Sequence, residues 1–430
     1  MLRTDAKAAL ATMLTTALLL SACPQEKPPV PPVLSTPAAT AETLATPETV
    51  CNYVVMIDAS SESSRAYTFQ VEPASNGGLP TISQISYAKA EPGLVSFKDS
   101  PDDAAGSIAG LLTSADSVLA KLPDECEGKT PTVLMATAGM RLLAEQAGDS
   151  ATTAIFDAVS QTIRDTGLDL RFAGTIGSRQ EAVYTWLTAN YALGRLSGDQ
   201  ETVGLLDLGA AATSIAFVPE NGEGANTTLK LGGQSVPIYA YSYTGYGIDT
   251  ALTYVADDTC FPKGLRTGTG RFDKCLKMLA PVVTPTSCAG TCGLATPGTE
   301  AKEGVLQPPL PKAMSFYATG HLQATHTLLG LDSDATTPAA LTNAAGGAKG
   351  KTGICGTKWT RLQEANADAK PQHLESLCFS ATWIAVLIDG LGFARNSAQI
   401  TWTNQFDDST AAPGLALGAA LCSSTGCFSE

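Results

Sequence analysis

The chain has 430 residues, 44% of them hydrophobic and 16% charged, and its 27 Lys and Arg residues against 41 Asp and Glu residues give a net charge of −14. This composition is too apolar for a disordered chain, and the length suits two domains of about 150–200 residues each. The acidic excess argues against nucleic-acid binding, because affinity for phosphate backbones comes mainly from Lys and Arg clusters. Three histidines are too few for a multi-histidine metal centre.

The first residues have the pattern of an export signal. Arg3 and Lys7 precede an apolar run over residues 8–20. This run is shorter than the roughly 20 residues that span a bilayer as a helix. The run leads through Ser and Ala into Cys23, a pattern that resembles the lipobox of bacterial lipoproteins. In that class the signal is cut before the cysteine, which is then lipidated. We therefore expect a signal peptide over residues 1–22 and a membrane anchor on Cys23, with an ordinary signal peptide as the alternative.

A proline-rich segment follows, over residues 23–49, with Thr, Ala and Glu between the prolines and no core pattern. Such a composition predicts a semi-extended tether that holds a folded part away from a membrane. The expected location is the bacterial cell envelope, lipid-anchored and facing the periplasm or the surface.

Of the 11 cysteines, ten remain when Cys23 is set aside, and an even number in an exported chain predicts up to five disulfides. Zinc is the competing interpretation, but the two closely spaced pairs have no histidine near them. The pairing is left open by the sequence. Short loops favour Cys355–Cys378, Cys422–Cys427 and two local bridges among Cys260, Cys275, Cys288 and Cys292, with Cys51–Cys126 left by elimination.

Two matching units follow along the chain. An apolar strand over residues 52–58 ends in Asp58, and a loop of small residues leads to a returning strand at 66–71. The arrangement recurs where the strand at 202–207 ends in Asp207 and a small-residue loop leads to the strand at 215–218. Small residues let backbone N–H groups approach a phosphate, and an Asp at a strand end can hold a hydrated divalent cation. Two such units predict duplicated domains that face one cleft.

Between these units, strands and helices alternate. A strand at 131–136 leads into a helix after Thr137, and a strand near Phe172 leads into a helix near Ser178. Residues 101–122 and 154–167 have helical spacing and are expected to cover the sheet. This alternation is typical of an α/β protein.

Five segments, taken together and in this order, carry a family resemblance: IDASSESSR at 57–65, ATAGMR at 136–141, EAVYTW at 181–186, LDLGAAAT at 206–213 and CFSATWI at 378–384. They resemble the apyrase-conserved regions of the nucleoside triphosphate diphosphohydrolases, which have the actin/Hsp70/sugar-kinase fold. The similarity extends from about Tyr53 to Leu421. It implies an α/β fold of two RNase-H-like (actin-like ATPase) lobes with an active-site cleft between them. We expect lobe I at 50–170 plus 401–430, and lobe II at 171–400 with a Cys-rich insertion at 260–310.

The resemblance implies a monomeric enzyme that hydrolyses the terminal phosphate of nucleoside tri- and diphosphates with Mg²⁺ or Ca²⁺. Asp58 and Asp207 are expected to hold the metal through waters, with Thr137 facing it. Glu181 is the expected general base for the attacking water. Arg141 and Trp383 are expected to contact the nucleobase. The expected phosphate-binding residues are Ser60, Ser61, Ser63, Ser64, Arg65, Gly209, Ala210, Ala211, Ala212 and Thr213.

Each candidate also has a purely structural interpretation. Glu181 follows Ser178 by three residues, as in a capping box that satisfies the N–H groups at a helix start. Asp58 and Asp207 have the side chain of a turn former. Arg141 suits a surface position, and Trp383 on an apolar helix suits a core position.

The chain also departs from the family pattern. Ser60 and Ser63 stand where relatives have glycines, which restricts any position that needs a positive φ, and Glu62 replaces a serine with a carboxylate that repels phosphate. Ala212 and Ser214 replace the side chains that hold the nucleophilic water in relatives, and Ala210 replaces a glycine. Two alternatives therefore stay open. One is a weakened or inactive nucleotide-binding relative, and the other is a phosphatase for polyphosphate or another phosphoanhydride.

Overall fold

The computed structural model describes residues 51–75, 77–114, 118–198, 200–254, 258–287, 291–295, 304–332, 336–348, 350–406 and 414–428. The expected signal peptide, the tether and Cys23 lie outside these ranges, and so does Cys288. None of the helices within them combines the length and the apolar character that crossing a membrane requires.

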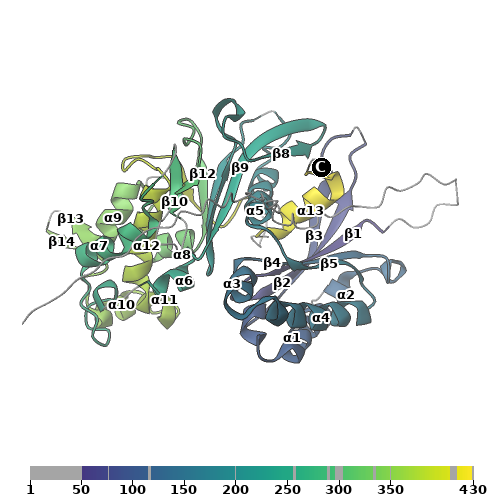
Figure 1. Cartoon of the computed structure of the whole chain (residues 1–430), viewed down its shortest axis with the longest axis horizontal. Helices are drawn as coiled ribbons and strands as arrows, with labels where there is room; N and C mark the ends of the chain where they lie inside the picture. The colour runs from purple at the N-terminus through teal and green to yellow at the C-terminus, as the bar shows by residue number, and fades with distance from the viewer. Residues whose placement is uncertain are drawn as a thin grey trace, which may run out of the picture. The chain divides into compact units, whose positions relative to one another are not determined.

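The first sheet has five strands in the order β3-β2-β1-β4-β5 (Figure 1). β1, β2 and β3 form antiparallel hairpins, whereas β4 pairs in parallel with both β1 and β5. The strands are β1 (Tyr53–Ala59), β2 (Ser64–Glu72), β3 (Thr81–Ala90), β4 (Pro131–Ala136) and β5 (Asp169–Thr175).

Helices cover both faces of this sheet, because side chains alternate between the faces along a strand. In β1, Val55 and Ile57 pack into a core with α1 and α4, whereas Val54 and Met56 pack into a core with α13 on the opposite face (Figure 1). The helices of this part are α1 (Pro101–Thr113), α2 (Val118–Lys121), α3 (Ala138–Ala147), α4 (Asp149–Asp165) and α13 (Ala416–Thr425).

The second sheet has six strands in the order β15-β12-β6-β7-β9-β8. β6 and β7 form the antiparallel hairpin that matches β1 and β2, and β12 pairs in parallel with β6 and with β15. The strands are β6 (Gly204–Leu208), β7 (Ala212–Phe217), β8 (Thr227–Leu231), β9 (Gln234–Thr244), β12 (Phe316–Gly320) and β15 (Ile400–Trp402).

One face of the second sheet packs against a large helical core. Phe217 and Phe316 from the strands meet Phe379 and Trp383 from α12 in that core. Two small hairpins lie outside the sheet, β10 (Cys292–Ala295) with β11 (Gly304–Leu306) and β13 (Gly347–Ala348) with β14 (Lys351–Thr352). The helices are α5 (Ser178–Ala192), α6 (Ile248–Leu252), α7 (Phe272–Val283), α8 (His321–Leu328), α9 (Pro338–Gly346), α10 (Trp359–Ala365), α11 (Pro371–Glu375) and α12 (Leu377–Gly390).

Helices α5 and α13 pack closely against each other. A Cβ on Gly418 of α13 would lie only 1.9 Å from the carbonyl oxygen of Tyr184 on α5, so this contact requires glycine. The Gly418 N–H also donates to Thr188 Oγ1 at 2.8 Å. Since α5 also packs on β9 of the second sheet and α13 on β1 of the first, this helix pair connects the two sheets.

Most of the predicted strands and helices are present, but the expected lobe boundaries differ in two places. β5 belongs to the first sheet and ends at Thr175, beyond the expected boundary at 170. The strand near 401 was expected to complete lobe I, yet β15 pairs with β12 of the second sheet. The reason is apolar burial, because Ile400 and Trp402 are part of the core on that sheet. From the 401–430 segment, α13 and the preceding Leu415 pack on the first sheet.

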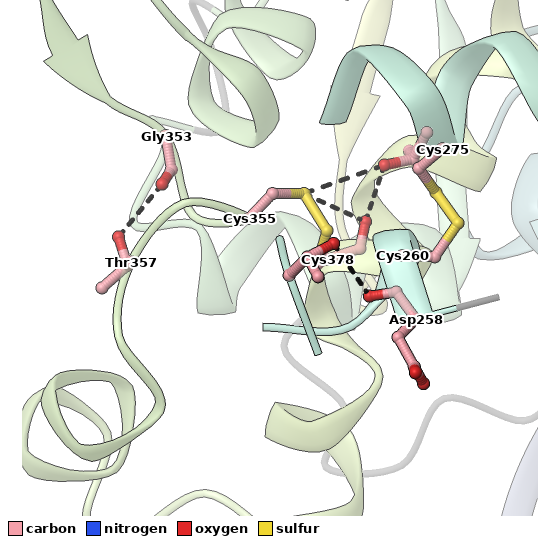
Figure 2. The surroundings of a disulfide bond; sticks show 9 residues. Asp258, Cys260, Cys275, Gly353, Cys355, Thr357 and Cys378 are labelled. Atoms are coloured by element: carbon pink, nitrogen blue, oxygen red, sulfur yellow. Dashed lines mark hydrogen bonds between the residues drawn. A yellow bond between two sulfur atoms is a disulfide. The ribbon is translucent and has the colours of Figure 1, made fainter. Parts of the chain in front are cut away.

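Four of the favoured disulfides are present. They are Cys51–Cys126, Cys260–Cys275, Cys355–Cys378 and Cys422–Cys427. Figure 2 shows Cys355–Cys378, both of whose cysteines are buried, together with Cys260–Cys275 near the start of α7. Cys292 is also disulfide-bonded. These bridges confirm the disulfide interpretation of the cysteines over the zinc interpretation for these four pairs.

Candidate active site

A pocket of about 380 Å³ is lined by the loops of both hairpins, β1–β2 and β6–β7. This volume is in the range of small-molecule sites. Eleven of the residues expected from the sequence line it: Asp58, Ser60, Ser61, Arg65, Thr137, Glu181, Asp207, Gly209, Ala210, Ala211 and Ala212. The two hairpins therefore do face one site, although residues 58 and 207 lie far apart in the sequence.

The two loops have the same backbone turn. The N–H of Ser60 donates to the carbonyl oxygen of Ser63 at 2.9 Å, and the N–H of Gly209 donates to that of Ala212 at 2.9 Å. The Ser60 hydroxyl also donates to the Ser63 carbonyl oxygen at 2.9 Å. Neither serine has a positive φ, since among the described residues other than glycine only Asn221 and Arg266 do. The expected strain from replacing glycines is therefore absent.

A glycine supports each loop from behind. A Cβ on Gly93 would lie 2.4 Å from the carbonyl oxygens of Ser60 and Ser61. A Cβ on Gly247 would lie 2.2 Å from the backbone of Ala210 and Ala211. Neither glycine was among the site residues expected from the sequence; the structure shows that each lets another backbone approach a loop closely.

Three carboxylates line this pocket, of which Asp58 is buried and Asp207 and Glu181 are partly buried. Asp58 is the penultimate residue of β1, Asp207 lies on β6 and Glu181 lies in the first turn of α5. Burial raises the pKa of Asp58 to about 6, opposed by Arg65, whose Nη1 lies 3.7 Å from Asp58 Oδ2. Burial also raises the pKa of Asp207, opposed by a 2.6 Å hydrogen bond from Thr319 Oγ1. Negative charge is thus concentrated in a site where a cation would stabilise it.

The surroundings of Glu181 are set by Arg141 of α3. Nη2 of Arg141 donates to Glu181 Oε2 at 2.6 Å, Nη1 donates to the carbonyl oxygen of Ile176 at 2.9 Å, and Nε donates to Thr244 Oγ1 at 2.9 Å. Burial raises the pKa of Glu181, and Arg141 opposes that rise. The capping interpretation of Glu181 is wrong, because Gln180 makes the contact to the N–H of Gly177 at the start of α5.

Five expected site residues do not line the pocket. Ser63 and Ser64 are fully buried at the start of β2, and Thr213 donates to the carbonyl oxygen of Tyr246 at 2.7 Å. Arg141 is committed to Glu181 and its neighbours, so its expected contact with a nucleobase is wrong. Trp383 is fully buried, stacks on Tyr246 with ring centroids 5.9 Å apart, and belongs to the core. Because the Trp383 side chain is buried in the core, its expected role in base stacking is wrong.

The donor set of the pocket suits a hard divalent cation. Asp58 Oδ1 is buried and has no hydrogen-bond partner in the part of the chain that the structure describes. Asp207 and the hydroxyl of Thr137 supply further oxygens, which Mg²⁺ and Ca²⁺ prefer. The described residues contain no group of three His, Cys, Asp or Glu side chains that could ligate an ion directly. Since Mg²⁺ usually keeps several of its waters, two carboxylates fit a hydrated ion.

Two histidines at the pocket were not anticipated from the sequence. His321 begins α8, and its Nε2 lies 3.5 Å from Oε2 of Glu62 in the first loop. His373 of α11 also lines the pocket, with its ring 6.4 Å from that of His321. Glu62 therefore faces an imidazole, although its side chain is 48% exposed. The sequence offered one indication of these residues: the chain has three histidines, and two of them line this pocket.

Comparison with known proteins agrees with this site. A model of the GDA1/CD39 (nucleoside phosphatase) family matches residues 44–260. Probable apyrase 3 of Arabidopsis thaliana is 29% identical over 412 residues, which cover 85% of this chain and 81% of that protein. Ectonucleoside triphosphate diphosphohydrolase 8 of Gallus gallus is 29% identical over 410 residues, covering 82% and 78%.

The fold has a counterpart among solved structures. The crystal structure of nucleoside triphosphate hydrolases from Neospora caninum matches with a TM-score of 0.59 at 15% identity, over 87% of this chain and 93% of that one. The expected fold of two actin-like α/β lobes is thereby confirmed. Because the family model covers half of the chain and the apyrase relatives cover most of it, the chain belongs to the GDA1/CD39 (nucleoside phosphatase) family.

Proposed function

We propose that this protein hydrolyses the terminal phosphate of nucleoside tri- and diphosphates with Mg²⁺ or Ca²⁺ as cofactor, using Glu181 as the general base. The observation that carries the proposal is the convergence of Asp58, Glu181 and Asp207 on one pocket lined by two matching loops. Two loops of small residues supply backbone N–H groups, which suit phosphate oxygens.

In this mechanism the chain mainly positions its substrate. Backbone groups of the loops at Ser60–Ser61 and Gly209–Ala211 hold the phosphates, and Thr137 contributes its hydroxyl beside them. Glu181 accepts a proton from the attacking water as the water oxygen bonds to phosphorus, and the bond from phosphorus to the leaving phosphate oxygen breaks. Arg141 orients Glu181 and favours its charged form.

Asp58 and Asp207 would hold a hydrated divalent cation, which would neutralise phosphate charge when bound. The buried orphan oxygen of Asp58 supports this assignment. Burial raises the pKa values of Asp58 and Asp207 and so favours their protonated forms. A bound cation therefore stabilises the folded protein most when both carboxyls are ionised.

The test is phosphate release from ATP, ADP and polyphosphate, measured with Mg²⁺, with Ca²⁺ and with EDTA. We expect release from the nucleotides that EDTA abolishes, and a 10²–10⁴-fold lower kcat in Glu181→Gln, the range typical of a lost general base. Release from polyphosphate alone would point to the phosphoanhydride alternative, and no release from any substrate would point to an inactive relative. Unchanged kcat in Glu181→Gln contradicts the assigned base.

We further propose that the protein acts outside the cytoplasm, anchored to a membrane of the bacterial cell envelope by a lipid on Cys23. The pattern of residues 1–23 and the disulfides of the folded part support this location. Fractionation of cells that express the full chain tests it. Cys23→Ser should move the protein from the membrane fraction to the soluble fraction, and an unchanged distribution contradicts the anchor.

A further inference from the structure

The Glu62–His321 pair is a contact between the two sheets at the pocket. Glu62 belongs to the loop between β1 and β2, and His321 follows β12 of the second sheet. Both side chains line the pocket, and the His321 side chain is 22% exposed against 48% for Glu62. The imidazole is thus enclosed, whereas its carboxylate partner lies closer to solvent and can leave.

The backbone before His321 lies close to the second loop and to a proposed metal ligand. Gly320 has a φ of 65°, and a Cβ there would be 2.5 Å from the carbonyl oxygen of Leu208 and 3.0 Å from Asp207 Oδ1. The N–H of Gly320 donates to Asn404 Oδ1 at 2.8 Å, which holds this segment in place. His321 is therefore fixed within the phosphate-binding region rather than on a mobile rim.

The charges around His321 favour its protonated form. Glu62 of the first loop, Asp249 of α6 and Asp207 of β6 raise the pKa of His321 against the effect of burial, and the neighbouring His373 is the other titratable group that faces it. The same contact lowers the pKa of Glu62. An imidazolium at the start of a helix is unfavourable by itself, so the carboxylates sustain this charge.

A carboxylate in a phosphate-binding loop repels a phosphate. Here the Glu62 carboxylate contacts the His321 imidazole, which, when protonated, can instead donate to a phosphate. We propose that His321 is a phosphate-binding residue of this pocket, and that Glu62 holds its imidazole until the phosphate chain of the nucleotide takes over that contact. The inference rests on the proposed function and adds to it a phosphate contact from His321. It accounts for Glu62 in a loop whose other residues, Ser60, Ser61 and Ser63, are all small.

The test compares kcat and KM for ADP with Mg²⁺ in wild type, His321→Gln, His321→Lys and Glu62→Gln. Loss of a charge-assisted hydrogen bond should raise the KM of His321→Gln roughly tenfold, with kcat changed less than about threefold. His321→Lys restores a cation and should return KM to within about threefold of wild type. Glu62→Gln, measured at pH 6, should lower KM about two- to fivefold, because the competing carboxylate charge is gone. Asp169→Asn is the control, since Asp169 pairs with Arg171 on β5 and does not line the pocket.

The pH dependence gives a second measurement. The KM of wild type should rise as the pH rises and the imidazole loses its proton, and in Glu62→Gln this rise should begin at lower pH. In His321→Lys the KM should stay flat between pH 6 and 8.

Three results overturn the inference while leaving the proposed function intact: an unchanged KM in His321→Gln, a fall in kcat that lysine does not restore, or a tenfold rise in KM in Glu62→Gln. If the wild type hydrolyses no nucleotide, the proposed function is contradicted, and the role of His321 is then tested by nucleotide binding. Calorimetric titration with the β,γ-imido analogue of ATP and Mg²⁺ should then show roughly tenfold weaker binding to His321→Gln than to wild type. Equal binding to both proteins, or none to wild type, overturns the inference.

Discussion

Arg141 and Glu181 form a buried ion pair, with 2.6 Å between Nη2 and Oε2, that connects the helix after β4 to the helix after β5. The side chains are 15% and 13% exposed, so neither charge is well solvated. Removing one partner of such a pair leaves the other buried and uncompensated. The pair therefore controls both the position and the protonation of the proposed base.

We expect Arg141→Ala to lower kcat/KM about 10²-fold at pH 7 and to move the acidic limb of its pH profile upward. The physical reason is that Arg141 lowers the pKa of Glu181, which burial raises, so that without the guanidinium the carboxyl stays protonated to higher pH. Assays from pH 5 to 9 measure the limb. Arg195→Ala is a control, because the Arg195 guanidinium donates to the exposed carbonyl oxygen of Glu201 and does not line the pocket. An unmoved limb contradicts the coupling.

Asp58→Asn should stabilise the metal-free protein at pH 7.5 while abolishing activity. The pKa of Asp58 is raised from 3.8 to about 6, so its favourable contribution to stability is complete below pH 3.8 and is lost as the pH rises through about 6. At pH 7.5 the ionised carboxylate therefore costs up to about 3 kcal/mol. Melting temperatures in EDTA should be higher for the variant at pH 7.5, and the gain should shrink toward pH 5.

Mg²⁺ provides the complementary measurement. It should raise the melting temperature of wild type at pH 7.5 and have little effect on Asp58→Asn, because binding to the folded state alone stabilises it. Equal effects of Mg²⁺ on both proteins would show that Asp58 does not hold the ion.

A single methyl group behind either loop should impair activity. Gly93→Ala and Gly247→Ala place a Cβ 2.4 Å and 2.2 Å from loop backbone atoms, although both glycines have φ values that alanine adopts, −69° and −72°. Displacing a phosphate loop by about 1 Å costs on the order of 10²-fold in rate. We therefore expect kcat/KM to fall by about that factor in each variant. Gly110→Ala on α1 is the matched control, because nothing lies within 4 Å of its Cβ, and it should retain activity.

The disulfides should differ in their contribution to stability. Cys51–Cys126 closes a separation of 75 residues and Cys422–Cys427 one of 5, for which the chain-entropy model gives about 4 and about 2 kcal/mol. The Cys51→Ser/Cys126→Ser variant should thus lose more melting temperature than Cys422→Ser/Cys427→Ser. Thermal denaturation of both double variants, in the absence of reductant, checks the order. A larger loss for the second pair contradicts the model.

The strands that carry the two loops were predictable because each is a buried apolar run that ends in Asp and small residues, as at Asp58 and Asp207. β3 was not, since its exposed and half-buried positions leave no regular alternation. Residues 377–388 of α12 are almost all buried, so their hydrophobic pattern does not distinguish a core face from an exposed face. The prediction for Trp383 therefore came from its resemblance to a base-stacking position. The partners of Arg141 and His321 lie 40 and 259 positions away, and only the fold reveals such contacts.

The packing of α13 has a consequence for the order of folding. Val54 and Met56 near the start of the folded part share a core with residues 416–420, and the α5 helix that carries Glu181 has Gly418 as its neighbour. Contacts between such distant segments form late, because closing a long loop costs entropy before the contact returns any free energy. We therefore expect the pocket to assemble only after α13 has been synthesised, because α13 packs on the helix that carries Glu181.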